Sequence, residues 1–232
     1  MYLLTETASP FALERWAAFF ANFGQFAKGF FYTLGISIGA LMVALLLGLI
    51  FGAMSSTHNK VLRGISRVYV EIFQNTPLLV QFVVVFYGIS ILTDGHVMIP
   101  ISLTAILCVG VYTGAYISEI IRTGIEAVPK GQTEAALSQG FTYADTMRII
   151  ILPQAVRTIL PPLTNQVVNL IKNTSTVAII SGADIMFTAK AWAYDTTNYV
   201  PAFAGAAFLY FIMCFPLATW ARRKEEENKK AY

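Results

Sequence analysis

Long uncharged stretches separated by short polar segments run through most of this chain. The first stretch, residues 29–57, contains no charged residue and is long enough for a tilted helix across a bilayer. Four more apolar stretches, with at most one charge each, follow at residues 72–93, 97–118, 160–183 and 201–221. The pattern predicts an all-α membrane protein whose five transmembrane helices form a core over residues 30–222.

Small and polar residues inside these stretches refine the prediction. Two Gly-x3-Gly pairs, in residues 35–39 and 48–52, have the spacing that allows close approach of membrane helices. A polar run in residues 74–81 contains Pro77, which predicts a kink in the second span. Before it, a basic loop is expected at His58, Lys60, Arg63 and Arg67.

The segments outside the predicted spans are short. Ser9-Pro10 followed by an aromatic-rich sequence predicts an amphipathic helix within residues 1–29, lying along the membrane surface. Residues 184–200 predict a short helix and a loop outside the hydrocarbon, and residues 223–232 a solvated, charged tail.

Composition supports a membrane protein and narrows its chemistry. The chain has 56% hydrophobic residues, 12% charged residues and a mean hydropathy of +0.61. Its net charge of +3 is scattered over several segments, so no nucleic-acid partner is expected. Cys108 and Cys214 lie in apolar stretches as packing residues, and His58 and His96 stand alone, so we expect no metal site.

The sequence offers no arrangement typical of catalysis or nucleotide binding. It has no Gly-x4-Gly-Lys-Ser/Thr loop and no nucleophile with a plausible histidine partner. We therefore expect no cofactor on this chain, and a pump built on it would use a separate ATPase that binds the ATP.

The water-compatible passage at residues 126–153 predicts two short helices with a bend between them. Thr133 is expected to cap the first helix, and Gly140 to end it in a left-handed conformation. Thr142 and Asp145 have the spacing of a capping box for the second helix, which Pro153 is expected to end. Such a bent helical pair suits insertion into a groove on another protein.

The distribution of Lys and Arg predicts the orientation in the membrane. If residues 126–153 are cytoplasmic, the same side holds twelve basic residues, against Arg15, Lys28 and Lys190 outside. The positive-inside rule then places the N-terminus outside and the C-terminal tail inside. The twelve are Lys60, Arg63, Arg67, Arg122, Lys130, Arg148, Arg157, Arg222, Arg223, Lys224, Lys229 and Lys230.

The spacing of Glu134-Ala135-Ala136, Gly140, Ile150 and Leu152-Pro153 resembles the EAA motif of the membrane-spanning subunits of ABC importers. Segments 73–81, 116–122, 128–132 and 172–175 are similar to the polar amino acid branch of that family, and the resemblance covers about residues 30–222. It implies a type I ABC importer permease fold in the cytoplasmic membrane of a prokaryote. It also implies ABC ATPase subunits, a second permease subunit, identical or homologous, and an extracytoplasmic substrate-binding protein as partners.

The resemblance implies that residues 126–153 form the region through which a partner ATPase drives the membrane domain. The alternative is a solvated cytoplasmic loop that has no partner. The expected contact residues are Glu134, Ala135, Ala136, Leu137, Gly140, Tyr143, Asp145, Met147 and Arg148.

A polar stripe in the fourth span is the candidate substrate path. On a helix, one side carries Asn165, Asn169, Lys172, Asn173 and Thr176, and Thr174 and Ser175 adjoin it. Two interpretations remain open for Lys172. It binds the carboxylate of an amino acid, helped by a helix break near Asn173, or it pairs with Glu71 or Glu119 and joins helices.

Two further polar residues are weaker candidates for the path. Gln81 either lines it or makes hydrogen bonds at the kink near Pro77. Glu119 either is neutralised by Arg122, three residues later, or faces the path and receives a substrate ammonium.

The prediction from sequence is therefore an ATP-driven permease for polar amino acids, working by alternating access. The lysine in the stripe favours glutamate, glutamine or aspartate as the substrate. An ion-coupled secondary carrier is the alternative, and a non-transporting scaffold is a third possibility.

Overall fold

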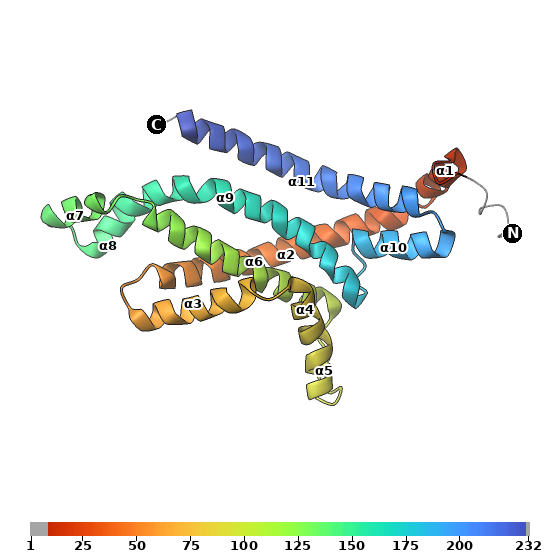
Figure 1. The fold of residues 1–232 in the computed structure, drawn as a ribbon, viewed down its shortest axis with the longest axis horizontal. Helices are drawn as coiled ribbons and strands as arrows, with labels where there is room; N and C mark the ends of the chain where they lie inside the picture. The colour runs from red at the N-terminus through yellow and green to blue at the C-terminus, as the bar shows by residue number, and fades with distance from the viewer. Residues whose placement is uncertain (1–8, 231–232) are drawn as a thin grey trace.

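The computed structural model describes residues 9–230, and all regular elements in this range are helices. Residues 1–8 of the predicted N-terminal region and residues 231–232 of the predicted tail lie outside the described range. The helices form an elongated bundle with α7 and α8 at one end and α1 and α10 at the other (Figure 1). The all-α prediction is confirmed for the described residues.

Helices α2 (Phe23–Ser55) and α6 (Ile101–Glu126) pack side by side and form the centre of the bundle. They approach closely at glycines, since a Cβ added at Gly48 would lie 2.4 Å from Cγ2 of Ile117. The second predicted Gly-x3-Gly pair is therefore a helix contact. In the first pair only Gly39 meets a neighbour, because a Cβ at Gly35 has nothing within 4 Å.

Helix α3 (Lys60–Gln74) occupies the place of the predicted basic loop, so that prediction was wrong. The loop is confined to residues 56–59, and Asn59 caps the helix by accepting a hydrogen bond from Val61 N at 2.9 Å. Ser66 donates to the carbonyl of Phe51 at 2.7 Å, and Tyr69 donates to the carbonyl of Val111 at 2.7 Å. Lys60, Arg63 and Arg67 lie on a different side of α3 from Ser66 and Tyr69, so their charges do not interfere with the packing of this helix against α2 and α6.

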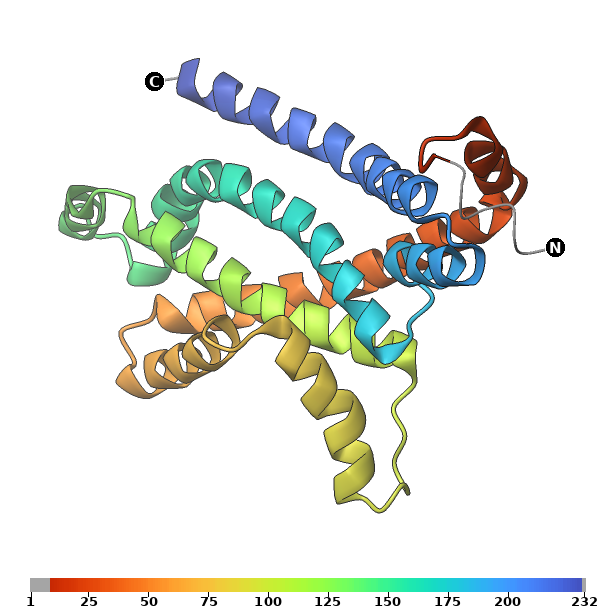
Figure 2. The same ribbon diagram turned by 45° about the vertical axis from the view of Figure 1, so that its right-hand side comes forward.

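The predicted second span is not one helix. After α3 the chain bends by 97° into a second segment made of α4 (Leu78–Val83), the π-helical η1 (Val84–Gly88) and α5 (Ile89–Leu92). We call residues 78–92 the arm, and Figures 1 and 2 both show it pointing away from the rest of the bundle. Gln81 Nε2 donates to the carbonyls of Phe73 and Thr76 at 3.2 Å each, so it satisfies backbone groups left free at the bend.

The predicted number of five spans is not confirmed. Within the described residues, length and hydropathy identify three spanning helices, α2, α6 and the Tyr199–Lys224 part of α11 (Tyr199–Lys230), and a fourth if α3 and the arm count as one. Helix α9 (Leu152–Asn173), the expected fourth span, is not among them. Its sequence carries Pro161, Pro162 and the polar stripe, which lower its hydropathy.

Helix α1 (Leu13–Ala21) packs at the end of the bundle formed by α10 (Ile185–Thr196) and the start of α11. It begins at Leu13 rather than at Ser9-Pro10, because a turn closed by the Ala12 N–H and the Ser9 carbonyl (2.9 Å) precedes it. Buried Phe19 makes edge contacts with Phe26 of α2 and Trp192 of α10. The predicted short helix in residues 184–200 is confirmed as α10.

Candidate functional site

The bend at Gly140 has the geometry that its sequence predicts. Helix α7 (Lys130–Ser138) ends in a Schellman motif, in which Phe141 N donates to the Ala136 carbonyl at 3.1 Å and Gly140 N to that of Leu137 at 3.0 Å. The φ angle of Gly140 is +88°, a left-handed conformation that only glycine adopts at little cost. The predicted stop of the first helix is confirmed.

The second helix of the pair begins directly after the bend, as α8 (Tyr143–Asp145) and the π-helical η2 (Thr146–Ile151). Thr142 Oγ1 accepts a hydrogen bond from Asp145 N at 3.2 Å and donates one to Asp145 Oδ2 at 2.5 Å. The predicted cap at Thr142 is therefore confirmed, and it fixes the direction in which the second helix starts.

Two predicted boundaries of this region were wrong. Thr133 does not cap α7, because the helix already starts at Lys130 after Pro129 and contains Thr133 in its interior. Pro153 does not end the second helix, because η2 leads straight into α9 and the proline occupies the first turn of α9. The proline lies where the π-helical hydrogen-bond pattern of η2 changes to the α-helical pattern of α9, so the continuous helix tolerates the missing N–H there.

Most of the predicted contact residues are exposed, and α7 and α8 lie at one end of the bundle (Figure 1). Ala136 is buried and Met147 is half-buried, so these two support the helical pair from inside. The Tyr143 ring meets the His58 ring edge to face at 5.3 Å, which connects α8 to the loop between α2 and α3. The exposed members are Glu134, Ala135, Leu137, Gly140, Tyr143, Asp145 and Arg148.

The predicted polar stripe is partly exposed and partly turned inward. Asn165, Asn169 and Lys172 are exposed on α9, whereas Thr174 is buried and donates to the Ile171 carbonyl at 2.7 Å. Asn173, Ser175 and Thr176 are half-buried. After Asn173 the α-helix changes to the 3₁₀-helix η3 (Thr174–Ile180), at the position of the predicted helix break.

Lys172 pairs with neither of the two carboxylates proposed for it. Glu119 binds Arg122, and Glu71 accepts a hydrogen bond from Asn75 Nδ2 at 2.9 Å. Lys172 instead borders a cavity of about 290 Å³, together with Ser175 and with Tyr210 of α11. The lysine is therefore available to a ligand, to water or to another chain.

The other two candidates for the path do not border the cavity at Lys172. Gln81 makes its hydrogen bonds at the bend before the arm. Glu119 forms a bidentate ion pair with Arg122, which also binds Glu126 Oε2 at 2.5 Å. The structure agrees with neutralisation of Glu119 by Arg122.

Sequence reasoning missed a buried carboxylate beside this cavity. Asp184 caps α10 by accepting from Phe187 N at 2.8 Å, and it accepts from the Tyr210 hydroxyl at 3.0 Å. Burial raises the pKa of Asp184 to about 6, although these hydrogen bonds act in the opposite direction. The sequence signal was the aspartate directly before the helix, in the position of an N-cap.

The comparison with known proteins identifies the family. The family described as "Binding-protein-dependent transport system inner membrane component" matches residues 44–225. The chain belongs to this family.

Within residues 9–230, no group of three or more His, Cys, Asp or Glu side chains is placed to hold a metal ion.

Individual relatives agree with this membership. The chain is 37% identical over 216 residues to a probable glutamine ABC transporter permease, GlnM of Bacillus subtilis, covering 92% of this chain and 97% of the relative. It is 33% identical over 208 residues to the glutamate/aspartate import permease GltJ of Escherichia coli, with 82% and 85% coverage. The predicted resemblance to the permeases of polar amino acid ABC importers is confirmed.

Solved structures confirm the fold. The crystal structure of an amino acid ABC transporter with histidines superposes with a TM-score of 0.84 at 31% identity, covering 91% of this chain and 98% of that one. The inward-facing methionine transporter MetNI superposes with a TM-score of 0.69 at 16% identity, which is a likeness of fold alone. The chain is a helical membrane component with the type I ABC permease fold.

Proposed function

We propose that this chain is the permease subunit of an ATP-driven importer of polar amino acids in the cytoplasmic membrane of a prokaryote. The observation that carries the proposal is the helical pair α7–α8, which presents the EAA residues at one end of the bundle. Two permease subunits enclose the path, each bound to one ABC ATPase, and a substrate-binding protein delivers the amino acid from outside. ATP binds to the ATPase and not to this chain.

The coupling role is supported by the geometry of the helical pair. The left-handed Gly140 and the cap at Thr142 fix the angle between α7 and α8 with bonds inside the pair. Exposed Leu137 and Tyr143 provide apolar contacts for a groove on the ATPase, and Asp145 and Arg148 provide rim charges. Closure of the ATPases moves this pair and switches the path between inward and outward opening.

The orientation has the N-terminus outside and the C-terminus inside. The cytoplasmic end of α11 and the pair α7–α8 are at the same end of the bundle, and α1 is at the other (Figure 1). This agrees with the distribution of basic residues, which favours a cytoplasmic location for the helical pair.

For the substrate, glutamine, glutamate or aspartate is favoured. The two relatives named above are a probable glutamine permease and a glutamate/aspartate permease. Lys172 has no acidic partner among the described residues and supplies an ammonium for a carboxylate, while exposed Asn165 and Asn169 supply amides on the same side of α9.

Reconstitution tests the function directly. The permease is placed in proteoliposomes with its ATPase and the substrate-binding protein, and uptake of radiolabelled glutamine, glutamate and aspartate is measured with and without internal ATP. We expect uptake only with ATP and both partners. Uptake driven by an ion gradient without ATP would refute the proposal and establish the secondary carrier instead.

A further inference from the structure

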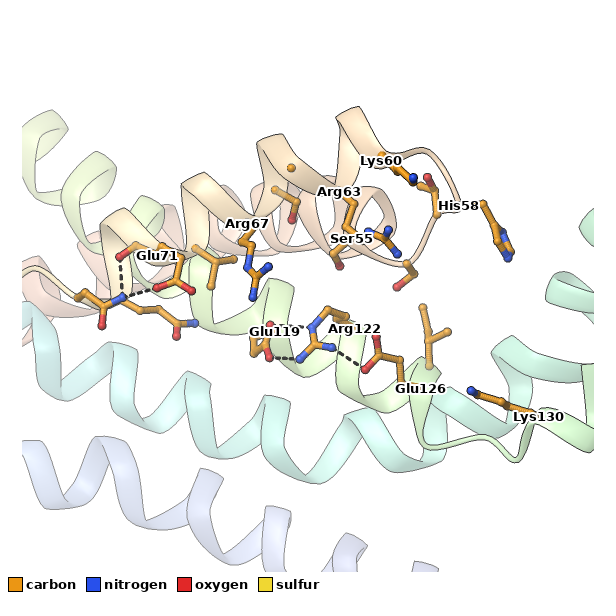
Figure 3. A pocket seen from close by; sticks show the side chains of 18 residues that line it. Ser55, His58, Lys60, Arg63, Arg67, Glu71, Glu119, Arg122, Glu126 and Lys130 are labelled. Atoms are coloured by element: carbon orange, nitrogen blue, oxygen red, sulfur yellow. Dashed lines mark hydrogen bonds and ion pairs between the residues drawn. The ribbon is translucent and has the colours of Figure 1, made fainter.

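A second cavity lies away from the polar stripe, between α3 and the end of α6 (Figure 3). Its volume is about 970 Å³, and the loop between α2 and α3 and the first residue of α7 also border it. It is rich in charged side chains, and how these charges are balanced decides what the cavity can bind.

The acidic side chains in the cavity already have partners. Arg122 binds both Glu119 and Glu126, so this group of three carries one net negative charge that is shared within it (Figure 3). Glu71 accepts a hydrogen bond from Asn75 Nδ2 at 2.9 Å. These carboxylates therefore do not form ion pairs with the remaining basic residues.

Four basic residues at the cavity have no acidic side chain within ion-pair distance among the described residues: Lys60, Arg63, Arg67 and Lys130. Arg63 and Arg67 project from α3 toward the side of α6 that carries Arg122 (Figure 3). Five cations and three carboxylates give the lining a net charge of +2, with His58 neutral. The cavity thus has the charge complementary to an anion.

An apolar surface runs along the same helix on the side away from this basic face. Val61, Ile65, Val68 and Ile72 are 69%, 50%, 59% and 51% exposed, and their spacing places them on one side of α3. Helical geometry sets this stripe about 150° from the face of Arg63 and Arg67, on nearly the opposite side of the helix. One helix therefore has an apolar side and a basic side, a combination typical of elements at the membrane interface.

We infer that the cavity binds the phosphodiester headgroup of an anionic phospholipid from the cytoplasmic leaflet. Basic pockets between membrane helices on the cytoplasmic side are suited to such headgroups because they match both charge and depth. The inference rests on the orientation in the proposed function. Because Lys130 is the first residue of α7, a bound headgroup also contacts the start of the coupling pair.

Lipid binding by the full chain, purified with its partner subunits, tests this inference. Native mass spectrometry measures the retention of phosphatidylglycerol and phosphatidylethanolamine after exposure to a mixture of both. The double variant Arg63→Gln/Arg67→Gln is compared with Arg222→Gln/Arg223→Gln, which removes the same charge from the cytoplasmic end of α11. Each basic residue near an anionic surface changes affinity about fivefold, so we expect the first pair to lower phosphatidylglycerol affinity by about 30-fold.

The control pair is expected to bind phosphatidylglycerol as the wild type does. Equal retention by both double variants, or no preference of the wild type for phosphatidylglycerol, would overturn the inference. If the arginine variant fails to fold, Lys60→Gln/Lys130→Gln removes two exposed charges from the same cavity and is expected to weaken binding similarly.

Two further measurements separate the lipid from other occupants. Millimolar inorganic phosphate is expected not to displace the lipid, and displacement would identify free phosphate as the ligand. Ile65→Cys is expected not to cross-link to a second copy, because the apolar side of α3 faces the bilayer; an efficient cross-link would show a protein interface there and count against lipid binding. Retained phosphatidylglycerol binding by Arg63→Gln/Arg67→Gln alongside unchanged ATP-driven uptake would overturn this inference alone and leave the proposed function intact.

Discussion

Replacement of Gly140 by valine isolates the bend between α7 and α8 from every other feature of the coupling region. A Cβ added at Gly140 meets nothing within 4 Å, so the substitution introduces no clash. What changes is the backbone energy, because φ at this position is +88°. A non-glycine residue in the left-handed region costs about 1–2 kcal/mol, and branching at Cβ adds to this.

The cost translates into a measurable loss of the bent conformation. Since 1.4 kcal/mol corresponds to a factor of ten, about 1–2 kcal/mol lowers the equilibrium constant between the bent and other conformations by about 5- to 30-fold. We expect Gly140→Val to lower ATP-driven uptake in proteoliposomes, by at most this factor, with membrane insertion unchanged. ATP hydrolysis should lose its dependence on the loaded binding protein.

The matched control is Gly131→Val on the same helix. Gly131 also has open space around its Cβ position but no positive φ, so this variant tests the added side chain without the backbone strain. Gly140→Ala should lie between the wild type and Gly140→Val. If Gly140→Val transports as well as Gly131→Val, the bend is not what couples the two subunits, and the reasoning fails.

Three other predictions address packing, pH and substrate. Gly48→Leu should lower the free energy of unfolding by about 1–3 kcal/mol, measured as a lower melting temperature, because its Cβ would overlap Ile117. Gly35→Leu should be nearly neutral, since a Cβ there meets nothing within 4 Å. Equal effects of the two substitutions would contradict the close contact of α2 and α6. The pKa of Asp184 is raised from 3.8 to about 6, so the folded state holds this proton more tightly and stability should fall, by at most about 3 kcal/mol, as pH rises through this window. The melting temperatures of the wild type and of Asp184→Asn should therefore change differently with pH between about pH 4 and 6. The same pH dependence in both proteins would refute the raised pKa of Asp184. Lys172→Met should weaken amino acid retention by an ATPase-deficient complex about 10- to 100-fold, while Lys190→Met leaves it unchanged; retention at wild-type level in Lys172→Met would exclude the lysine as a ligand.

Sequence reasoning succeeded where structure is encoded locally. The stop at Gly140 and the cap at Thr142 depend on residues within one turn, and both are present as predicted. It failed at α3, where Lys60, Arg63 and Arg67 were interpreted as a loop. A helix with one buried, one apolar and one charged side gives no uniform hydrophobic run, so its period was obscured by the charges.

The bend before the arm could be predicted in position but not in size. Pro77 indicated a kink, but the 97° angle depends on tertiary contacts that no local pattern encodes. Gln74 Nε2 donates to the Ala115 carbonyl at 3.1 Å, and Gln81 holds the carbonyls on the near side of the break. Without knowledge of these partners, the uncharged residues 72–93 were predicted to form a single span.

The same hydrogen bonds separate structural from functional polar residues in the apolar part of the chain. Ser66, Tyr69 and Gln74 each satisfy a carbonyl on a neighbouring helix, so their polarity is accounted for within the chain. Asn165 and Lys172 are exposed on α9, and neither has an ion pair or a strong hydrogen bond to a described residue. Polar groups at membrane depth are costly unless water, a ligand or another protein meets them. The exposed side of α9 is therefore incompatible with lipid, which favours a path completed by a second permease subunit.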